Sequence, residues 1–361
     1  MKKIQAGVLG ATGMVGQNYI RLLENHPWFE VTYVAASSQS AGKSYQDAVR
    51  GRWLMDSDIP ENVKTLIVND ANMTEQAKGN CQFVFSAVDG DKETIKKIEN
   101  SYAAADIPVV SNNSAHRWTV DVPILIPEIN PEHLDIIRDQ QGHYGWNKGF
   151  IVVKPNCSIQ SYMIPLYALM KKGYAPTRII VTTEQALSGA GYPGVASLDI
   201  LDNIIPYITG EAEKTEKEPC KVFGKISEGK IIPYDGLTIS ATCTRVNVQD
   251  GHTSIVNLEF GDKKPSLEEI IDIWTNFRAL PQEYELPSAP VHPILYRQEE
   301  NRPQPKKDRN MEKGMAVSVG RLRKCNVLDY KFVGLSHNTV RGAAGGGILS
   351  AELLNVLHYL E

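Results

Sequence analysis

The chain has 361 residues, of which 42% are hydrophobic and 22% charged. This composition is typical of a globular protein, and the length favours two domains over one. The net charge of -4, with no dominant basic face, argues against nucleic-acid binding, and no apolar run is long enough to span a bilayer. Five scattered cysteines without a CxxC pair indicate a reducing compartment, and no histidine has metal-ligand spacing. We expect a cytoplasmic protein with small-molecule partners and no metal.

A glycine turn opens the chain between a strand pattern and a helix pattern. The apolar run 5–9 leads into Gly10-Ala11-Thr12-Gly13-Met14-Val15-Gly16, and helical spacing follows over 19–23. Glycines let the backbone approach a pyrophosphate, whose charge the first helix amides bind. GxxGxxG also serves ordinary turns, so its place between strand and helix carries the prediction of a dinucleotide site.

The next strands favour a parallel sheet and NADP. The run 31–36 ends in Ser37-Ser38, without the acidic residue that binds the ribose of NAD. Serines with Lys43 nearby suit a 2′-phosphate, unless they form an ordinary loop. Buried apolar runs at 83–87 and 108–111 predict further strands covered on both faces. Ser86 ends one of them and leaves room for a cofactor, or forms a plain turn.

Cys157 is the first candidate for chemistry. It follows a strand pattern at 150–153 and precedes a helix pattern at 162–169. Helix-start amides and the helix dipole favour a thiolate, which predicts a lowered thiol pKa. The alternative is a buried cysteine that only fills space.

Three later stretches carry further candidates. Gln185 begins a loop of small residues, 185–191, that suits a flat ring or an ordinary turn. The charge run 211–221 is typical of a solvated face, unless a helix brings Glu218 and Lys221 to one side. Strand patterns at 239–246 and 252–256 flank a turn. Arg245 suits a carboxylate or phosphate and His252 suits proton transfer, although each residue type is more often structural.

The end of the chain has helical periodicity over 348–360 and should pack back on the first domain. The glycine run 345–347 before it allows close backbone contact near the cofactor, or forms a flexible turn. Residues 287–313, rich in proline and charge, predict a long connection that serves as a lid or a subunit contact.

Together these motifs resemble the aspartate-semialdehyde dehydrogenase family over nearly the full length. Ile239-Ser240-x-x-Cys243-x-Arg245-Val246, four residues, and Gly251-His252-Thr253 match the family signature at every specified position. Asn156-Cys157-Ser158, the Gln185 loop and Glu218-x-x-Lys221 occur in the family's order. The segments 301–305 and 314–317 look like the archaeal and fungal branch.

The resemblance implies an α/β fold similar to glyceraldehyde-phosphate dehydrogenase. An N-terminal Rossmann-like doubly wound sheet (1–155 with 337–361) would bind NADP. An α+β domain with a mixed sheet (156–336) would serve catalysis and dimerisation, giving a homodimer or homotetramer. The implied site residues fall into three groups: catalytic Cys157, His252 and Gln185; substrate- or phosphate-binding Arg245, Glu218, Lys221, Asn156 and Arg117; and NADP-binding Gly10, Thr12, Gly13, Met14, Val15, Ser37, Ser38, Ser86, Ser188, Gly189 and Asn338.

The implied reaction is the NADPH-dependent reduction of aspartyl-β-phosphate to aspartate-β-semialdehyde through a Cys157 thioester, for lysine, threonine and methionine biosynthesis. Two departures from the family pattern bear on it. Gln39 stands where many members have an arginine for the 2′-phosphate, which weakens the NADP preference. Ile159-Gln160 follows the cysteine where small residues are common, which alters the pocket wall.

The sequence leaves two alternative functions open. A related reductase could act on malonyl-CoA, another acyl-CoA or N-acetylglutamyl phosphate, and Glu218 would argue against malonyl-CoA because that substrate has no ammonium group. A nucleotide-sensing protein could keep the fold without the chemistry, but the joint presence of Cys157 and His252 argues against it.

Overall fold

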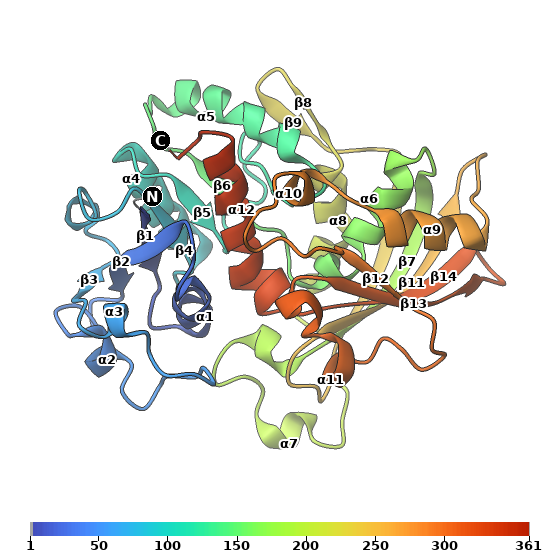
Figure 1. Ribbon diagram of the computed structural model, residues 1–361, viewed down its shortest axis with the longest axis horizontal. Helices are drawn as coiled ribbons and strands as arrows, with labels where there is room; N and C mark the ends of the chain where they lie inside the picture. Colours follow the sequence, from blue (N-terminus) through green and yellow to red (C-terminus); the bar gives the residue numbers. More distant parts are fainter. Residues whose placement is uncertain (1–2, 361) are drawn as a thin grey trace.

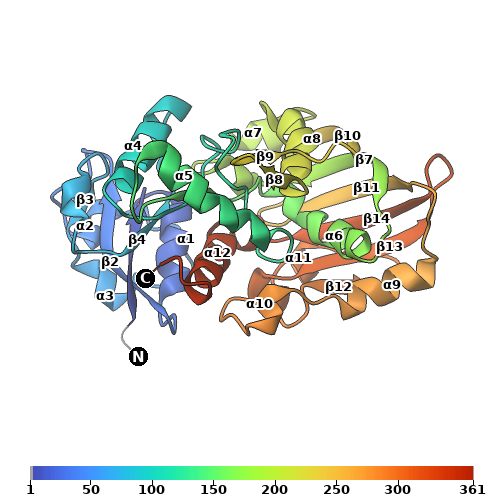
Figure 2. The same ribbon diagram turned by 90° about the horizontal axis from the view of Figure 1, so that it is seen from above.

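Two six-stranded sheets organise residues 3–360, the part of the chain that this computed structural model describes (Figure 1). The first sheet belongs to the amino-terminal half of the chain and the second to the carboxyl-terminal half. Seen from above, the two lie at opposite ends of the molecule, with helix α12 (Gly345–Val356) near their junction (Figure 2).

The first sheet is entirely parallel, in the order β3-β2-β1-β4-β5-β6. The strand order reverses at β1, and sheets of this kind bind ligands at the carboxyl ends of the strands beside that point. The doubly wound sheet expected from the sequence is therefore confirmed. Its strands are β1 (Ile4–Leu9), β2 (Phe29–Ala36), β3 (Val68–Asp70), β4 (Phe83–Ser86), β5 (Val109–Ser111) and β6 (Ile151–Val153).

Helices cover both faces of this sheet, because its strands carry apolar side chains to either side. Tyr102 of α4 (Lys92–Ala104) packs into the core on one face. Tyr19 of α1 (Met14–Leu23) stacks on Phe85 of the sheet, with ring centroids 4.5 Å apart, on the other. Helix α12 joins this second core, so the final helix returns to the first domain as predicted.

The second sheet is mixed, in the order β10-β7-β11-β14-β13-β12. The strand runs predicted at 239–246 and 252–256 do form strands, but they do not pair with each other, because β7 lies between them. Helices α6 (Met163–Lys171) and α9 (Leu267–Asn276) pack on this sheet. Its strands are β7 (Pro176–Gln185), β10 (Thr238–Arg245), β11 (His252–Phe260), β12 (Ile294–Arg297), β13 (Val317–Lys324) and β14 (Tyr330–Ser336).

The segment 287–313 differs from the long connection that its proline and charge content predict. It contains β12, which pairs with β13, and the short helix α11 (Pro305–Asp308). The buried carboxylate of Asp308 accepts a hydrogen bond from Arg302 Nε at 2.7 Å. The segment is therefore largely built into the second domain.

The glycine run near the end of the chain is helical and is not a flexible turn. Gly345, Gly346 and Gly347 form the first turn of α12. A Cβ atom on Gly347 would lie 2.0 Å from Tyr19 Oη, so a larger residue would push α12 away from α1. Glycine is required here by the close approach of two helices.

Shorter elements complete the chain. The remaining helices are α2 (Tyr45–Ala48), α3 (Glu61–Lys64), α5 (Ile137–Tyr144), α7 (Ser197–Ile200), α8 (Glu211–Val222) and α10 (Leu280–Glu283), and a small hairpin joins β8 (Lys225–Ser227) to β9 (Lys230–Ile232). The 3₁₀ turns are η1 (Thr74–Gln76), η2 (Pro131–Ile136), η3 (Ser158–Ser161), η4 (Leu187–Ala190) and η5 (Met311–Gly314), and a π turn, η6 (Val340–Ala344), precedes α12.

A buried ion pair ties the start of α12 to the first domain. Arg341 Nη1 and Nη2 donate to the two carboxylate oxygens of Glu128 at 2.6 Å each, and Arg341 Nε donates to Gln160 at 3.1 Å. Both charged side chains are almost fully buried. Since a bidentate pair of this kind satisfies both charges, loss of either partner leaves the other uncompensated.

Replacing Arg341 with methionine is expected to lower the free energy of unfolding by about 3–5 kcal/mol, because Glu128 would remain buried without its partner. Denaturant unfolding at neutral pH measures the change. Arg178→Met is the matched control, because it breaks an exposed pair with Glu259 and should cost less than about 1 kcal/mol. Equal effects of the two substitutions would contradict the prediction.

Candidate active site

Cys157 lies where the chain leaves the first sheet. It follows β6 by a short turn and directly precedes η3, which leads into α6. The predicted order of strand, cysteine and helix is therefore confirmed, with a 3₁₀ turn in place of the first helical turn. Gly342 packs against the cysteine so closely that a Cβ atom there would lie 2.7 Å from Cys157 Cβ. The nucleophile candidate thus sits beneath the segment that enters α12.

His252 contacts this cysteine, although the two residues are 95 positions apart in the sequence. It begins β11, is fully buried, and places Nε2 3.3 Å from Cys157 Sγ. The structure therefore brings together the thiol and the imidazole that the sequence singled out.

The second ring nitrogen of His252 defines its protonation state. The backbone N–H of Ala186 donates to His252 Nδ1 at 3.0 Å. Since Nδ1 accepts a hydrogen bond, the neutral ring carries its proton on Nε2, the atom that faces the sulfur. His252 is consequently arranged to donate a hydrogen bond at the site.

Burial controls the ionisation of both groups. Desolvation raises the pKa of the Cys157 thiol to about 11, and the Glu211 carboxylate adds to this, although Arg117, Lys154 and Arg245 oppose it. Desolvation lowers the pKa of His252 to about 3, with Arg245 as the next cause. The lowered thiol pKa expected from the helix start is wrong for the ligand-free chain, because a short 3₁₀ turn does not outweigh desolvation of the sulfur.

The rate of Cys157 alkylation by iodoacetamide should therefore still rise with pH above about pH 8, because only the thiolate reacts. Peptide mass spectrometry of the ligand-free protein measures the rate at Cys157 itself, and Cys325, which has a lowered pKa set by backbone N–H groups, serves as an internal reference that should react at lower pH. A plateau for Cys157 near neutral pH would contradict the raised pKa.

Two amide side chains flank the thiol. Asn156 Nδ2 and Gln185 Nε2 both donate to Oε1 of Glu211, at 2.5 Å and 3.0 Å. Asn156 turns its carbonyl oxygen toward Cys157 Sγ, 3.5 Å away. The NH₂ group of Asn156 is therefore not directed at the sulfur.

Arg245 ends β10 beside the same histidine. Its Nη1 donates to the carbonyl oxygen of Ala186 at 2.7 Å. A Cβ atom on Gly189 would lie 2.8 Å from Arg245 Nη1 and 2.9 Å from His252 Cε1. Glycine at this position lets the 185–191 loop cover both side chains.

The residues predicted to hold phosphate form a buried cluster next to Cys157. Arg117 Nη1 donates to Glu218 Oε1 at 2.9 Å, and the backbone N–H of Asn156 donates to Glu218 Oε2 at 2.6 Å. Lys221 Nζ donates to the carbonyl oxygens of Arg117 and Thr119 at 2.8 Å and 2.7 Å. Helix α8 continues through Pro219, and the side chains of Glu218 and Lys221 are both buried. The charge run 211–221 is therefore not simply a solvated face, because the helix brings these two residues to its inner side.

The predicted cofactor residues fall into two groups. In the first, Gly10 has a φ of +72° and a Cβ atom there would lie 2.1 Å from the carbonyl oxygen of Ala87, so the glycine loop crosses the end of β4 next to Ser86. The other members of this group are Thr12, Gly13, Met14 and Val15 at the start of α1, and the exposed Ser37 and Ser38 after β2.

The second group follows strands β7 and β14 of the second sheet. Asn338 Nδ2 donates to Ser188 Oγ at 2.8 Å, and Asn338 Oδ1 accepts from the backbone N–H of Gly251 at 2.8 Å. Because Gly251 precedes His252, this network is continuous with the contact between His252 and Cys157. Ser188 and Gly189 belong to the same loop.

Two buried residues at the site, Glu211 and Lys154, are not among those predicted from the sequence. Helical periodicity could have identified Glu211, because it lies two turns before Glu218 on the buried face of α8. No sequence pattern indicates that Lys154 is a site residue, because it simply follows a strand pattern. In the structure, desolvation lowers the pKa of Lys154 to about 7, and its charge lowers the pKa of Cys157.

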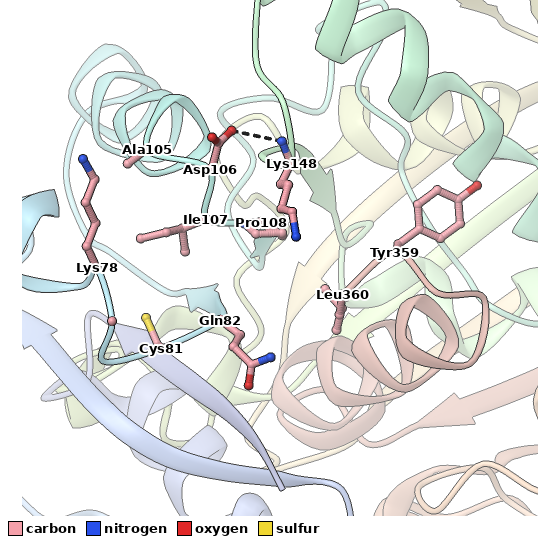
Figure 3. Close-up of a pocket in the computed structure, with 11 residues that line it drawn as sticks. Lys78, Cys81, Gln82, Ala105, Asp106, Ile107, Pro108, Lys148, Tyr359 and Leu360 are labelled. Carbon is pink, nitrogen blue, oxygen red and sulfur yellow. Dashed lines mark hydrogen bonds between the residues drawn. The ribbon is translucent and has the colours of Figure 1, made fainter. Parts of the chain in front are cut away.

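A cavity of about 280 Å³ lies away from this site (Figure 3). Cys81, Gln82, Ile107 and Pro108 line it, and these residues precede β4 and β5. It is therefore at the amino ends of the strands, the edge opposite to the one where such sheets bind ligands. Within residues 3–360, no cluster of three metal-ligating side chains is present, and no helix is long and apolar enough to cross a membrane.

Comparison with protein families agrees with this arrangement. The model described as "Semialdehyde dehydrogenase, NAD binding domain" matches residues 5–137, and "Semialdehyde dehydrogenase, dimerisation domain" matches residues 166–341.

Individual proteins match over almost the whole chain. Aspartate-semialdehyde dehydrogenase from Methanothermobacter thermautotrophicus is 47% identical over 98% of this chain and 99% of its own. The Aspergillus fumigatus enzyme is 43% identical over 99% of both chains. The crystal structure of the Candida albicans enzyme with NADP superposes with a TM-score of 0.89 at 39% identity, covering 99% of this chain and 100% of that one. The chain therefore belongs to the aspartate-semialdehyde dehydrogenase family.

Proposed function

We propose that this chain reduces aspartyl-β-phosphate to aspartate-β-semialdehyde with NADPH, and catalyses the reverse, phosphate-dependent oxidation. The reaction would supply lysine, threonine and methionine biosynthesis. The contact of 3.3 Å between Cys157 Sγ and His252 Nε2 carries the proposal. The name shared by relatives that are 40–47% identical supports the choice of substrate.

Cys157 acts as the nucleophile. Its sulfur attacks the acyl carbon, the bond to phosphate breaks, the proton of the thiol leaves with the departing phosphate, and a thioester remains on the protein. NADPH, when bound, supplies the hydride that reduces this thioester. The Nε2–H of His252 donates to the oxygen that gains negative charge, because Ala186 holds the ring in that tautomer. Expulsion of the sulfur then releases the aldehyde.

Substrate groups are held on either side of the thiol. The Arg245 guanidinium suits the substrate carboxylate, and Arg117 and Lys221 suit phosphate. Asn156 does not suit phosphate as it stands, because its NH₂ group donates to Glu211 and its backbone N–H donates to Glu218. The proposed ammonium site at Glu218 is more demanding, because each of its carboxylate oxygens already accepts a hydrogen bond. An ammonium group would have to share these oxygens, so Glu218 discriminates weakly against malonyl-CoA.

The residues present fit NADP. The glycine loop admits a pyrophosphate beside the amides of α1, since a side chain at Gly10 would collide with the backbone. Ser37 and Ser38 are exposed, and Lys43 is anchored nearby through a bond from Nζ to the carbonyl oxygen of Gln39. These groups suit a 2′-phosphate, and the relative from Candida albicans was solved with NADP.

The test is reduction of NADP by the purified protein with aspartate-β-semialdehyde and phosphate. Parallel reactions contain malonate semialdehyde with CoA, or NAD in place of NADP. We expect phosphate-dependent turnover with the first substrate and a preference for NADP. Faster turnover with malonate semialdehyde and CoA would overturn the proposal in favour of an acyl-CoA reductase.

We further propose that the chain is a homodimer or a homotetramer. Between 192 and 207 the chain exposes five large apolar side chains: Tyr192, Leu198, Leu201, Ile204 and Tyr207. Ile180 of β7 and Ile255 of the paired strand β11 are also exposed. Exposed apolar patches of this kind mark interaction surfaces, and a second copy of the chain is the partner that a dimerisation domain implies. The double substitution Leu198→Asp and Ile204→Asp should give monomers in sedimentation velocity, whereas an unchanged assembly would rule this surface out.

The five cysteines are all free thiols. This supports the proposal that the protein works in a reducing compartment such as the cytoplasm.

A further inference from the structure

Glu211 is a buried carboxylate that the reaction described above does not use. It begins α8 and is only 7% exposed. Its Oε1 accepts from Asn156 Nδ2, Gln185 Nε2 and Ser158 Oγ, at 2.5 Å, 3.0 Å and 3.4 Å. The other oxygen, Oε2, lies 3.5 Å from Lys214 Nζ. One carboxylate oxygen thus collects donors from both sides of the nucleophile.

This contact decides which end of each amide faces the thiol. An amide presents a donor end and an acceptor end, and a carboxylate binds only the donor end. Asn156 therefore points Oδ1 toward Cys157 Sγ at 3.5 Å. Gln185 Oε1 has no hydrogen-bond partner within residues 3–360, while Gln185 Nε2 is held by Glu211 and Thr183.

We propose that Glu211 is a positioning residue, which fixes the orientation of the Asn156 and Gln185 amides so that their carbonyl oxygens, and not their NH₂ groups, face the reacting centre. The inference rests on the proposed role of Cys157 as nucleophile. Without the carboxylate, each amide can rotate by half a turn, and the acceptor beside the thiol is lost.

The charge of Glu211 gives this role a second signature. The charged groups that act on Cys157 are Glu211, which raises the pKa of the thiol, and Arg117, Lys154 and Arg245, which lower it. The neighbouring His252 stays neutral because burial lowers its pKa to about 3. Removing the carboxylate charge should therefore make the thiol ionise at lower pH even though the amides are less ordered. Thiol reactivity and turnover should change in opposite directions.

The experiment compares two substitutions at Glu211. Glu211→Gln removes the charge; kcat for aspartate-β-semialdehyde should fall by about 10²-fold with little change in KM, and the pH profile of Cys157 alkylation should move to lower pH. Glu211→Asp keeps the charge but shortens the side chain, so it should lower kcat and leave the alkylation profile in place. Glu213→Gln is the matched control, because it makes the same charge change at an exposed position in the same helical turn.

Each readout can overturn the inference. Wild-type kcat in both Glu211 variants would rule out the positioning role. An alkylation profile of Glu211→Gln that coincides with that of Glu213→Gln would rule out the electrostatic signature. Alkylation does not depend on the substrate, so this second arm remains informative if the wild-type protein does not oxidise aspartate-β-semialdehyde, the result that would defeat the proposed function instead. Thermal unfolding of each variant checks that the fold is intact.

Discussion

Replacing Cys157 with serine is expected to reduce kcat by at least about 10⁴-fold, because a serine hydroxyl at this position cannot form the thioester. The substitution changes one atom, so binding of NADP should stay close to that of the wild type. Steady-state turnover and fluorescence titration with NADPH measure the two effects separately.

Cys325→Ser is the control for this prediction. Cys325 lies between β13 and β14, where its sulfur contacts Asn257 and the backbone N–H of Leu328 and not His252. Its replacement should leave kcat unchanged. If Cys157→Ser retained more than about a tenth of wild-type turnover, nucleophilic catalysis by this sulfur would be refuted.

Replacing His252 with asparagine is expected to lower kcat by about 10²- to 10³-fold, the range typical for loss of a hydrogen-bond donor to a developing oxyanion. Asparagine can still accept the hydrogen bond from the Ala186 N–H, but it has no donor at the position of Nε2. The effect should therefore fall on the chemical step, which single-turnover kinetics isolate from substrate binding.

His252→Gln distinguishes hydrogen-bond donation from proton transfer. A glutamine amide can place an N–H near the position of Nε2, so it should recover part of the lost kcat if donation to the developing oxyanion is sufficient. Equal losses in His252→Asn and His252→Gln would show that a transferable proton is needed, contrary to the role of hydrogen-bond donor proposed for Nε2.

The pH dependence of the wild type follows from the same ring. Since burial holds the pKa of His252 near 3, well below its usual value of 6.5, the ring stays neutral as the pH falls from 7 to 5. Titration of His252 therefore should not reduce kcat/KM of the free protein in this range, and His252→Asn should leave the shape of the profile unchanged there. A wild-type limb near pH 6 that disappears in His252→Asn would contradict this.

Local sequence patterns were sufficient to predict much of the fold and the residue types that are candidates for chemistry. Apolar runs and the glycine turn predicted the parallel sheet, because strand burial and sharp backbone turns depend on residues close together in sequence. The signature around Arg245 and His252 identified the imidazole partner of Cys157. The structure places His252 Nε2 in contact with Cys157 Sγ. The roles of the substrate and cofactor residues and the domain limits remain predictions.

The order of the strands in the second sheet and the ionisation of Cys157 could not be predicted from the sequence. Nothing local indicates that β7 lies between β10 and β11, since strand order is set by contacts between segments far apart in the chain. The helix-start argument predicted an acidic thiol at Cys157, but the surrounding packing removes water from the sulfur and raises its pKa to about 11. Glu211 was placed on a solvated face because a run of charges does not show which of its members the fold buries.

Backbone preferences and apolar periodicity fix the local elements, and the motifs identify a cysteine, a histidine and an arginine as candidates for one site. Contacts between distant segments direct the Nε2 proton of His252 toward the sulfur, raise the pKa of the Cys157 thiol through burial, and bring the NH₂ groups of both amides onto Glu211. The reason is physical: hydrogen-bond direction and desolvation depend on atoms brought together from distant parts of the chain, whereas backbone preference and apolar periodicity are properties of neighbours.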